Sequence, residues 1–165
     1  MFDLDPLERP FKDFHIPNIS KMEYKNLCVG PNGAKLHEFS SQYHHESRAC
    51  NILLRDPTFV WFSSYYESLP QHITIEFNGT YKIRRLGVYL HGENSQNPKV
   101  IEFSLGVTPD SFRVVKTVEL EHRAGEHIFD LDEPVEARFI KTRVLENFGG
   151  SGIYISKILA FPTAQ

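Results

Sequence analysis

Two-residue alternation in the centre of the chain constrains its fold more than any other feature. In 73–77, apolar residues alternate with Thr74 and Glu76, and the segment 101–105 repeats the pattern. Such alternation is typical of an antiparallel strand with one buried face. The segments that we predict as strands, about eight in all, are 35–40, 72–77, 83–91, 99–107, 113–120, 126–131, 137–145 and 153–161.

Turn-forming residues separate these segments, and no long helical pattern lies between them. Asn78-Gly79, the run 108–110 and the glycine-rich run 149–152 are turn signals. Only 46–54 fits a helical turn. Regularly spaced strands without intervening helices predict an all-β sandwich or barrel. In 153–161 the apolar residues fall on two opposite phases, and a bulge would reconcile them.

The chain has 165 residues, which is the size of one domain. Its first thirty residues differ from the rest, because Pro6, Pro10 and Pro17 break up scattered hydrophobic residues that fit neither helical nor strand periodicity. We predict an extended N-terminal arm over 1–30 and a folded domain over 31–165. The arm's hydrophobic residues are expected to pack on its own domain or on a partner.

Composition excludes several classes of function. The formal net charge is −3 and the basic residues form no run, so nucleic-acid binding is not expected. No stretch reaches the length of a membrane span, and 1–10 is acidic, unlike a signal peptide. Cys28 and Cys50 sit beside apolar residues and are predicted to be free thiols, which favours a reducing, intracellular compartment.

Catalytic and metal-binding motifs are missing from the sequence. The eight histidines show no HExxH or clustered Cys/His spacing. Carboxylate pairs such as Asp130/Asp132 flank turns, and no Lys-Ser/Thr pair follows the glycines of 149–152, so that loop is not a phosphate cradle. We therefore predict no enzyme activity, no metal site and no cofactor.

Aromatic and amide side chains on loops are the remaining candidates for function. Trp61 is the only tryptophan and lies between a polar turn and an alternating strand, so we expect it to be a buried anchor. Loops on a rigid scaffold commonly carry recognition. The predicted partner-binding residues are Tyr65, Tyr66, Glu67, His91, Glu93, Asn94, Asn147 and Phe148. The competing surface is a sheet face with Arg84, Arg85, Lys141 and Arg143.

Ordered motifs over about 35–162 carry a resemblance to a known family. They are Ser40-Ser41, the turn Ala49 to Leu53, Asp56-Pro57 followed by Trp61, Leu69-Pro70-Gln71-His72, the strand Ala137 to Lys141, and the stretch Asn147 through Phe161. This order resembles the galactose-binding-like jelly-roll superfamily, which includes the discoidin (coagulation-factor C-type, F5/8 type C) domains and the Doc domains of ubiquitin ligases. The resemblance implies an antiparallel β-sandwich jelly roll and structural roles for Ser40, Ser41, Asp56 and Trp61.

The resemblance also implies a function and a metal to consider. The chain lacks the disulfide of secreted discoidin domains and is similar to intracellular members, which implies a non-enzymatic protein-interaction subunit or adaptor of centrosomal, ciliary or ubiquitin-ligase type. Its expected location is the cytoplasm, with centrosome, basal body and cilium as candidates. The alternative is a lectin-like module for carbohydrate or lipid head groups. Many members hold a structural calcium ion in the loop before the tryptophan; Asp56 is compatible with Ca²⁺, but Phe59 and Lys157 replace a common Thr and Glu.

Overall fold

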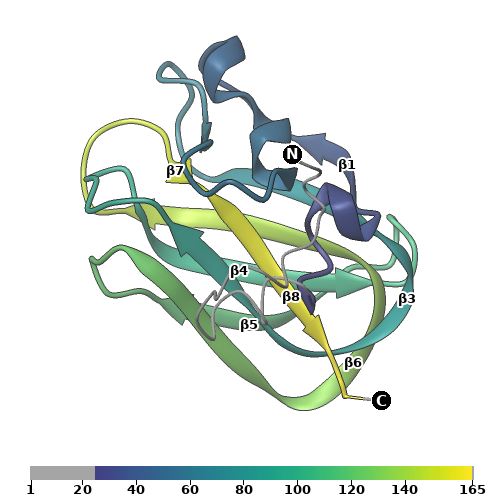
Figure 1. Cartoon of the computed structure of the whole chain (residues 1–165). Helices are drawn as coiled ribbons and strands as arrows, with labels where there is room; N and C mark the ends of the chain where they lie inside the picture. Colours follow the sequence, from purple (N-terminus) through teal and green to yellow (C-terminus); the bar gives the residue numbers. More distant parts are fainter. Residues whose placement is uncertain (1–24, 165) are drawn as a thin grey trace, which may run out of the picture.

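The computed structural model describes residues 25–164, which form an antiparallel all-β fold (Figure 1). Within them the strands are β1 (Lys35–Phe39), β2 (Trp61–Phe62), β3 (Gln71–Leu90), β4 (Pro98–Gly106), β5 (Arg113–Glu119), β6 (Gly125–Asn147), β7 (Tyr154–Ile155) and β8 (Lys157–Pro162). Short 3₁₀ turns are η3 (Gly30–Asn32), η4 (His45–Ser47) and η5 (Ala49–Leu53). The all-β jelly-roll prediction is confirmed, and η4 and η5 lie where a helical turn was expected.

The strands differ from the prediction at β2, which was not expected, and at two pairs of predicted strands that are each continuous. The segments 72–77 and 83–91 form one continuous strand, β3, and 126–131 and 137–145 likewise belong to β6. Irregular pairing between Glu76 and Tyr81, and between Ile83 and Arg85, accompanies the passage from one half of β3 to the other. A bulge lets a strand bend while its ladder continues, so turn-forming residues such as Asn78-Gly79 do not end the strand.

The two long strands link both layers of the sandwich. The first half of β3 pairs with β1 and with the second half of β6, which in turn pairs with β4 and then β5. The second half of β3 pairs with the first half of β6 and with β8. The inward residues include Ile75, Leu86, Phe103 and Ile140, which belong to one fully buried cluster.

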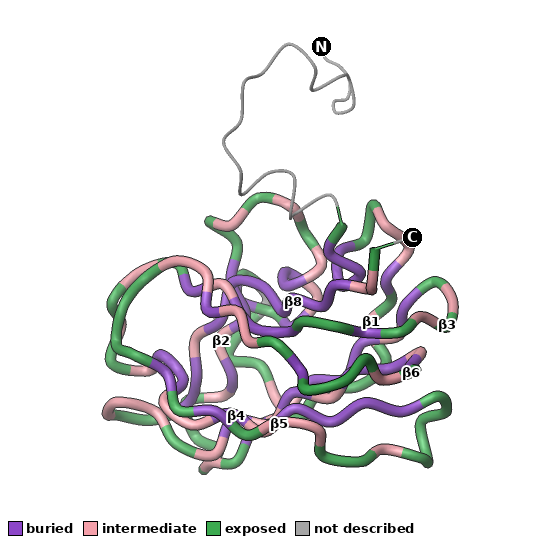
Figure 2. Tube along the Cα trace, turned by 90° about the horizontal axis from the view of Figure 1, so that it is seen from below, coloured by how far each residue is buried: buried purple, intermediate pink, exposed green. Residues whose placement is uncertain are grey.

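β7 and β8 resolve the ambiguous register of 153–161. The chain breaks its pairing at Ser156, so that β7 pairs with β2 whereas β8 pairs with β3. Ile155 and Ile158 are therefore both buried although they lie on opposite phases. Figure 2 shows β8 as an almost continuously buried strand and β1, at the edge of the sheet, as a largely exposed one.

Only the last part of the predicted N-terminal arm lies within the described residues. There, Asn26 donates its side-chain amide to the carbonyl of Ile158 (3.0 Å) and accepts from the backbone N–H of Ala160 (2.9 Å). Leu27, Cys28 and Val29 are buried beside it. This part packs on the chain's own domain, whereas the prediction for 1–24 falls outside the described residues. Cys28 and Cys50 are free thiols, as expected.

Helices of membrane-spanning length and apolarity do not occur among residues 25–164. The prediction that the chain lacks a transmembrane segment agrees with this finding over the described part of the chain.

Candidate functional site

One end of the sandwich gathers four connecting segments, and we call this end the mouth. These segments are 40–70 between β1 and β3, 91–97 between β3 and β4, 120–124 between β5 and β6, and 148–153 between β6 and β7. The last three come together at the left of Figure 1. Backbone bonds link them: Phe148 donates to the carbonyl of Ser95 (3.0 Å), and Tyr154 donates to that of Gln96 (3.2 Å). The bond from the backbone N–H of Ser63 to the carbonyl of Ile153 adds the segment after Trp61, so the loops that carry the predicted binding residues lie together.

Trp61 lies at the floor of the mouth and is fully buried. Its indole N–H donates to the backbone carbonyl of Ser41 at 2.8 Å, and its strand pairs with Ile155 of β7. A buried tryptophan contributes a large apolar area, and its N–H normally finds an acceptor. The ring therefore ties the segment after β1 to the end of the chain.

Gln71 joins the two serines of the Ser40-Ser41 motif. Both hydroxyls donate to its side-chain oxygen, at 2.6 Å from Ser40 and 2.5 Å from Ser41, while its amide nitrogen donates to the carbonyl of Ser68 (2.7 Å). Gln71 is buried. Ser41 also accepts from the backbone N–H of Ser64 (2.9 Å). The loops on both sides of β2 are thus held by one buried side chain, which belongs to the Leu69-Pro70-Gln71-His72 motif.

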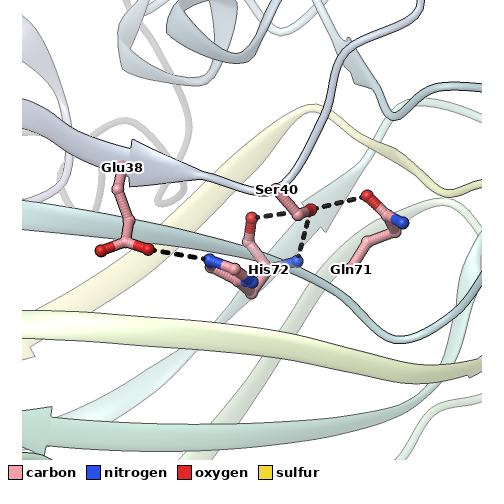
Figure 3. Close-up of polar contacts among 4 residues, drawn as sticks. All are labelled: Glu38, Ser40, Gln71 and His72. Atoms are coloured by element: carbon pink, nitrogen blue, oxygen red, sulfur yellow. Dashed lines mark hydrogen bonds and ion pairs between the residues drawn. The ribbon is translucent and has the colours of Figure 1, made fainter. Parts of the chain in front are cut away.

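The outer side of this junction continues along β1 and β3 (Figure 3). The Ser40 hydroxyl accepts from the backbone N–H of His72 (2.9 Å). His72 in turn contacts the Glu38 carboxylate through Nε2 at 3.2 Å. This pair is partly exposed and belongs to the sheet edge, so it stabilises the β1–β3 pairing more than it shapes the mouth.

Two predicted binding residues, Asn147 and Asn94, use their amides within their own loops. Asn147 donates to the carbonyls of Gly150 (3.2 Å) and Gly152 (2.7 Å) and accepts from Gly149 (3.0 Å), while the Asn94 oxygen accepts from Gln96 (2.8 Å). Gly150 and Gly152 have φ of 81° and 80°, which other residues rarely adopt. These asparagines therefore shape the mouth rather than face a ligand with these atoms.

Ser63 anchors the glycine-rich loop from below. It is fully buried, its hydroxyl accepts from the backbone N–H of Ile153 (2.9 Å), and its own backbone N–H donates to the carbonyl of Ile153 (3.0 Å). Nothing in the sequence distinguishes Ser63 beyond its place shortly after Trp61.

Exposed aromatic rings line one side of the mouth. Tyr65 and Tyr66, both predicted binding residues, are 51% and 86% exposed, and Tyr43 from the segment after β1 is 43% exposed. Their ring centroids are 6.2 Å apart between Tyr43 and Tyr65 and 5.7 Å apart between Tyr65 and Tyr66. Phe62 lies 5.3 Å from Tyr43 and continues the row to Tyr154. Sequence reasoning missed Tyr43, because only the pairing at Trp61 brings its segment beside 63–66.

The loops 120–124 and 148–153 carry a second aromatic contact. Phe148, another predicted residue, stacks on His122 with centroids 4.2 Å apart and ring planes 9° apart. His122 Nε2 also lies 3.2 Å from the carbonyl of Asn94, and the Lys99 ammonium is 6.0 Å from the Phe148 centroid. The remaining predicted residues, Glu67, His91 and Glu93, are exposed.

Asp56 lies in the loop to which the resemblance assigns calcium, and Lys157, at the start of β8, contacts that loop. The Asp56 carboxylate accepts from the backbone N–H (3.0 Å) and hydroxyl (2.8 Å) of Thr58; these bonds hold the pKa of Asp56 below its usual value, with smaller contributions from Lys157 and His91. The Lys157 ammonium donates to the carbonyl of Leu54. An ammonium group competes with Ca²⁺ for such an oxygen, so this residue pair does not match a calcium ligand set. Over residues 25–164, moreover, no cluster of three or more His, Cys, Asp or Glu side chains could hold a metal.

Two arginines of the competing basic face, Arg85 and Arg143, each form an ion pair with a different carboxylate. Arg85 contacts Asp130 at 2.8 Å in the second half of β3, whereas Arg143 contacts Glu102 at 3.2 Å in the sheet formed by the first half. These charges lie in different layers and are partly neutralised, so they form no common patch.

No protein-family model matches the sequence, and no curated protein matches it. Several solved structures do resemble the fold. The carbohydrate-binding module CBM32-3 of a family 31 glycoside hydrolase from Clostridium perfringens is 17% identical with a TM-score of 0.73, covering 87% of this chain and 98% of its own. The CBM32-5 module of a Clostridium perfringens family 89 enzyme, solved with GalNAc-β-1,3-galactose, is 21% identical with a TM-score of 0.68 (82% and 99% covered). A chitosan-binding module from Paenibacillus sp. IK-5 is 15% identical with a TM-score of 0.67 (82% and 98%).

These comparisons correct the predicted function. The expectation of an intracellular protein-interaction adaptor is wrong, because the structural neighbours are carbohydrate-binding modules and favour the lectin-like alternative. The motifs behind the expectation, such as Ser40-Ser41 and Trp61, build the floor of the fold and so do not distinguish its ligands. Cytoplasmic, centrosomal, basal-body or ciliary location stays a prediction that no comparison tests. At this level of identity the likeness establishes the architecture alone: the chain has the antiparallel β-sandwich jelly-roll fold of these modules.

Proposed function

We propose that the chain is a non-catalytic carbohydrate-binding module and that its mouth holds the glycan. The observation that carries the proposal is the row of exposed rings of Tyr43, Tyr65 and Tyr66 beside loops whose backbone is fixed by internal hydrogen bonds. Aromatic rings present a flat apolar face with a polar tip. That combination suits the apolar C–H face and hydroxyl rim of a sugar ring.

The surroundings of the row supply polar groups of the kind that hydroxyls require. Glu67 is exposed next to Tyr66, and Glu93 and His91 are exposed on the 91–97 loop. Few, well-placed polar groups around an aromatic surface are typical of small-molecule sites. We therefore expect an uncharged oligosaccharide, held by ring stacking and by hydrogen bonds from the loops.

A binding role also agrees with the comparisons, because the structural neighbours are carbohydrate-binding modules of glycoside hydrolases.

The test is direct binding of glycans by isothermal titration calorimetry. The probes are galactose, GalNAc-β-1,3-galactose and chitosan oligomers, with phosphatidylserine vesicles for the lipid-head-group alternative. We expect at least one glycan to bind, and Tyr65→Ala with Tyr66→Ala to weaken it by about 1–3 kcal/mol. Phe148→Ala reports whether the stacked pair of Phe148 and His122 also contributes to glycan binding.

Val114→Ala is the matched control, because Val114 is an exposed apolar residue near the other end of the sandwich. It should leave binding unchanged. Binding to the vesicles without binding to any glycan would contradict the proposal, as would equal loss in the tyrosine variant and the control.

A further inference from the structure

Lys157 is the most unusual side chain outside the mouth. It is fully buried, and lysine is almost never so buried unless its charge is paired. It is the first residue of β8, where its backbone lies opposite Tyr89 of β3. An unpaired ammonium in such a place would cost far more than a domain of this size can spare. Its placement therefore needs oxygen atoms that replace water.

The loop 54–60, which connects η5 to β2, presents those oxygens. The Lys157 ammonium donates to the carbonyl of Leu54, and the hydroxyl of the neighbouring Ser156 donates to the carbonyl of Pro57 at 2.6 Å. Both residues reach the loop from the start of β8. Two consecutive side chains thus hold two carbonyls of one loop.

Two further carbonyls of the loop also accept hydrogen bonds from groups of the chain. Asn51 donates its amide to Val60 (2.9 Å), and the backbone N–H of Phe59 donates to Asp56 (3.3 Å). The Asp56 carboxylate accepts from Thr58 and lies near enough to Lys157 for the ammonium to contribute to its lowered pKa. The carbonyl of Leu54 and the negative charge of Asp56 therefore both act on one internal cation.

We propose that the Lys157 ammonium is the organising cation of loop 54–60, and that the loop folds without a divalent metal ion. Carbonyl and carboxylate oxygens are the ligands that Ca²⁺ prefers. Here the Lys157 ammonium takes the place of the metal ion. A tethered cation cannot be removed by a chelator or diluted away. The stability of loop 54–60 is consequently independent of calcium concentration.

The test compares melting temperature in excess EDTA and in millimolar CaCl₂. The wild-type chain should melt at the same temperature in both. Lys157→Met should melt lower by about 5 °C or more, because the loop loses its cation, and should stay insensitive to calcium. Lys157→Glu should become more stable when calcium is added. Lys82→Met is the matched control, because Lys82 is exposed on β3, and it should change nothing.

Trypsin cleavage after Arg55 reports on the loop itself. The wild-type chain should be cleaved there at the same slow rate with and without calcium, and Lys157→Met should be cleaved faster. If Lys157→Met does not fold, the wild-type rates alone decide. Calcium-dependent melting or cleavage of the wild type would overturn the proposal, and so would a Lys157→Met variant as stable and as resistant as the wild type.

Discussion

The floor and the rim of the mouth are built from neighbouring residues but on opposite principles. The floor consists of Trp61, Ser41, Ser63 and Gln71, which are buried or nearly so and bonded to one another's segments. The rim consists of Tyr43, Tyr65 and Tyr66, whose rings are exposed. A single residue, Ser64, separates Ser63 from Tyr65, yet Ser63 supports the fold and Tyr65 faces solvent.

This contrast teaches that residues that stabilise the fold and residues that we propose to bind the glycan are separated within a single loop. Buried polar groups are costly to leave unpaired, so the floor must be fully bonded and tolerates little change. Removing an exposed ring changes the free energy of unfolding little, so the rim residues are free to vary with the proposed ligand. Substitutions on the floor should therefore change the free energy of unfolding, and substitutions on the rim should change binding.

The largest expected effect comes from Trp61→Ala. Removing this fully buried ring should lower the free energy of unfolding by about 3–5 kcal/mol, the usual range for a core aromatic. Urea denaturation measures it, and Trp61→Phe should cost less because most of the apolar volume is kept. A loss below about 1 kcal/mol would place Trp61 with the rim.

Gln71→Ala should have the next largest effect. The Ser40 and Ser41 hydroxyls would lose their shared acceptor, and the expected cost is about 1–3 kcal/mol. His72→Ala is the matched control on the neighbouring position; its pair with Glu38 is partly exposed, so its loss should cost under about 1 kcal/mol. Equal effects of the two substitutions would remove the distinction between the floor and the sheet edge.

Acidification should lower the free energy of unfolding through His127, which is buried beneath the 120–124 loop. Burial lowers the pKa of His127 below 6.5, more than its bond to the carbonyl of Arg123 raises it. The unfolded chain then binds the proton more readily, so the free energy of unfolding should fall as the pH drops below about 6.5. His127→Gln should make this decline shallower in denaturation series at several pH values. An unchanged pH dependence would show that His127 does not contribute.

Tyr66→Ala should have the smallest effect on stability. Its ring is 86% exposed, so the free energy of unfolding should change by no more than about 0.5 kcal/mol. The same denaturation measurement applies. A change above about 1 kcal/mol would mean that the rim also holds the fold together, which would break the comparison.

Local patterns were enough to predict the strands and the floor's central residue. Alternation in 73–77 and 101–105 marks half-buried strands wherever they occur, because side chains of a strand alternate between its faces. A lone tryptophan between a turn block and such a strand is likewise expected inside. Turn chemistry misled the prediction only where β3 and β6 bend without ending, since a bulge and a turn share the same residue types.

The composition of the rim could be predicted only in part. Tyr65 and Tyr66 stand out in the sequence, but Tyr43 joins them solely because β1 and β2 are brought together by Ser41 and Trp61. Asn94 and Asn147 look like ligand-binding amides until the structure pairs them with their own loops. An amide's partner depends on the conformation of the surrounding backbone, which residue type does not reveal.

The sequence by itself determined the strand pattern, the buried tryptophan and the resemblance to the jelly-roll superfamily, because each depends on the order and alternation of nearby residues. Only the tertiary structure decided which rings share the rim, which amides are already bonded, and that Lys157 is buried against the carbonyl of Leu54. These features join residues up to 103 positions apart. They are set by strand pairing across the whole fold, and pairing of distant segments leaves no periodic signal in either segment alone.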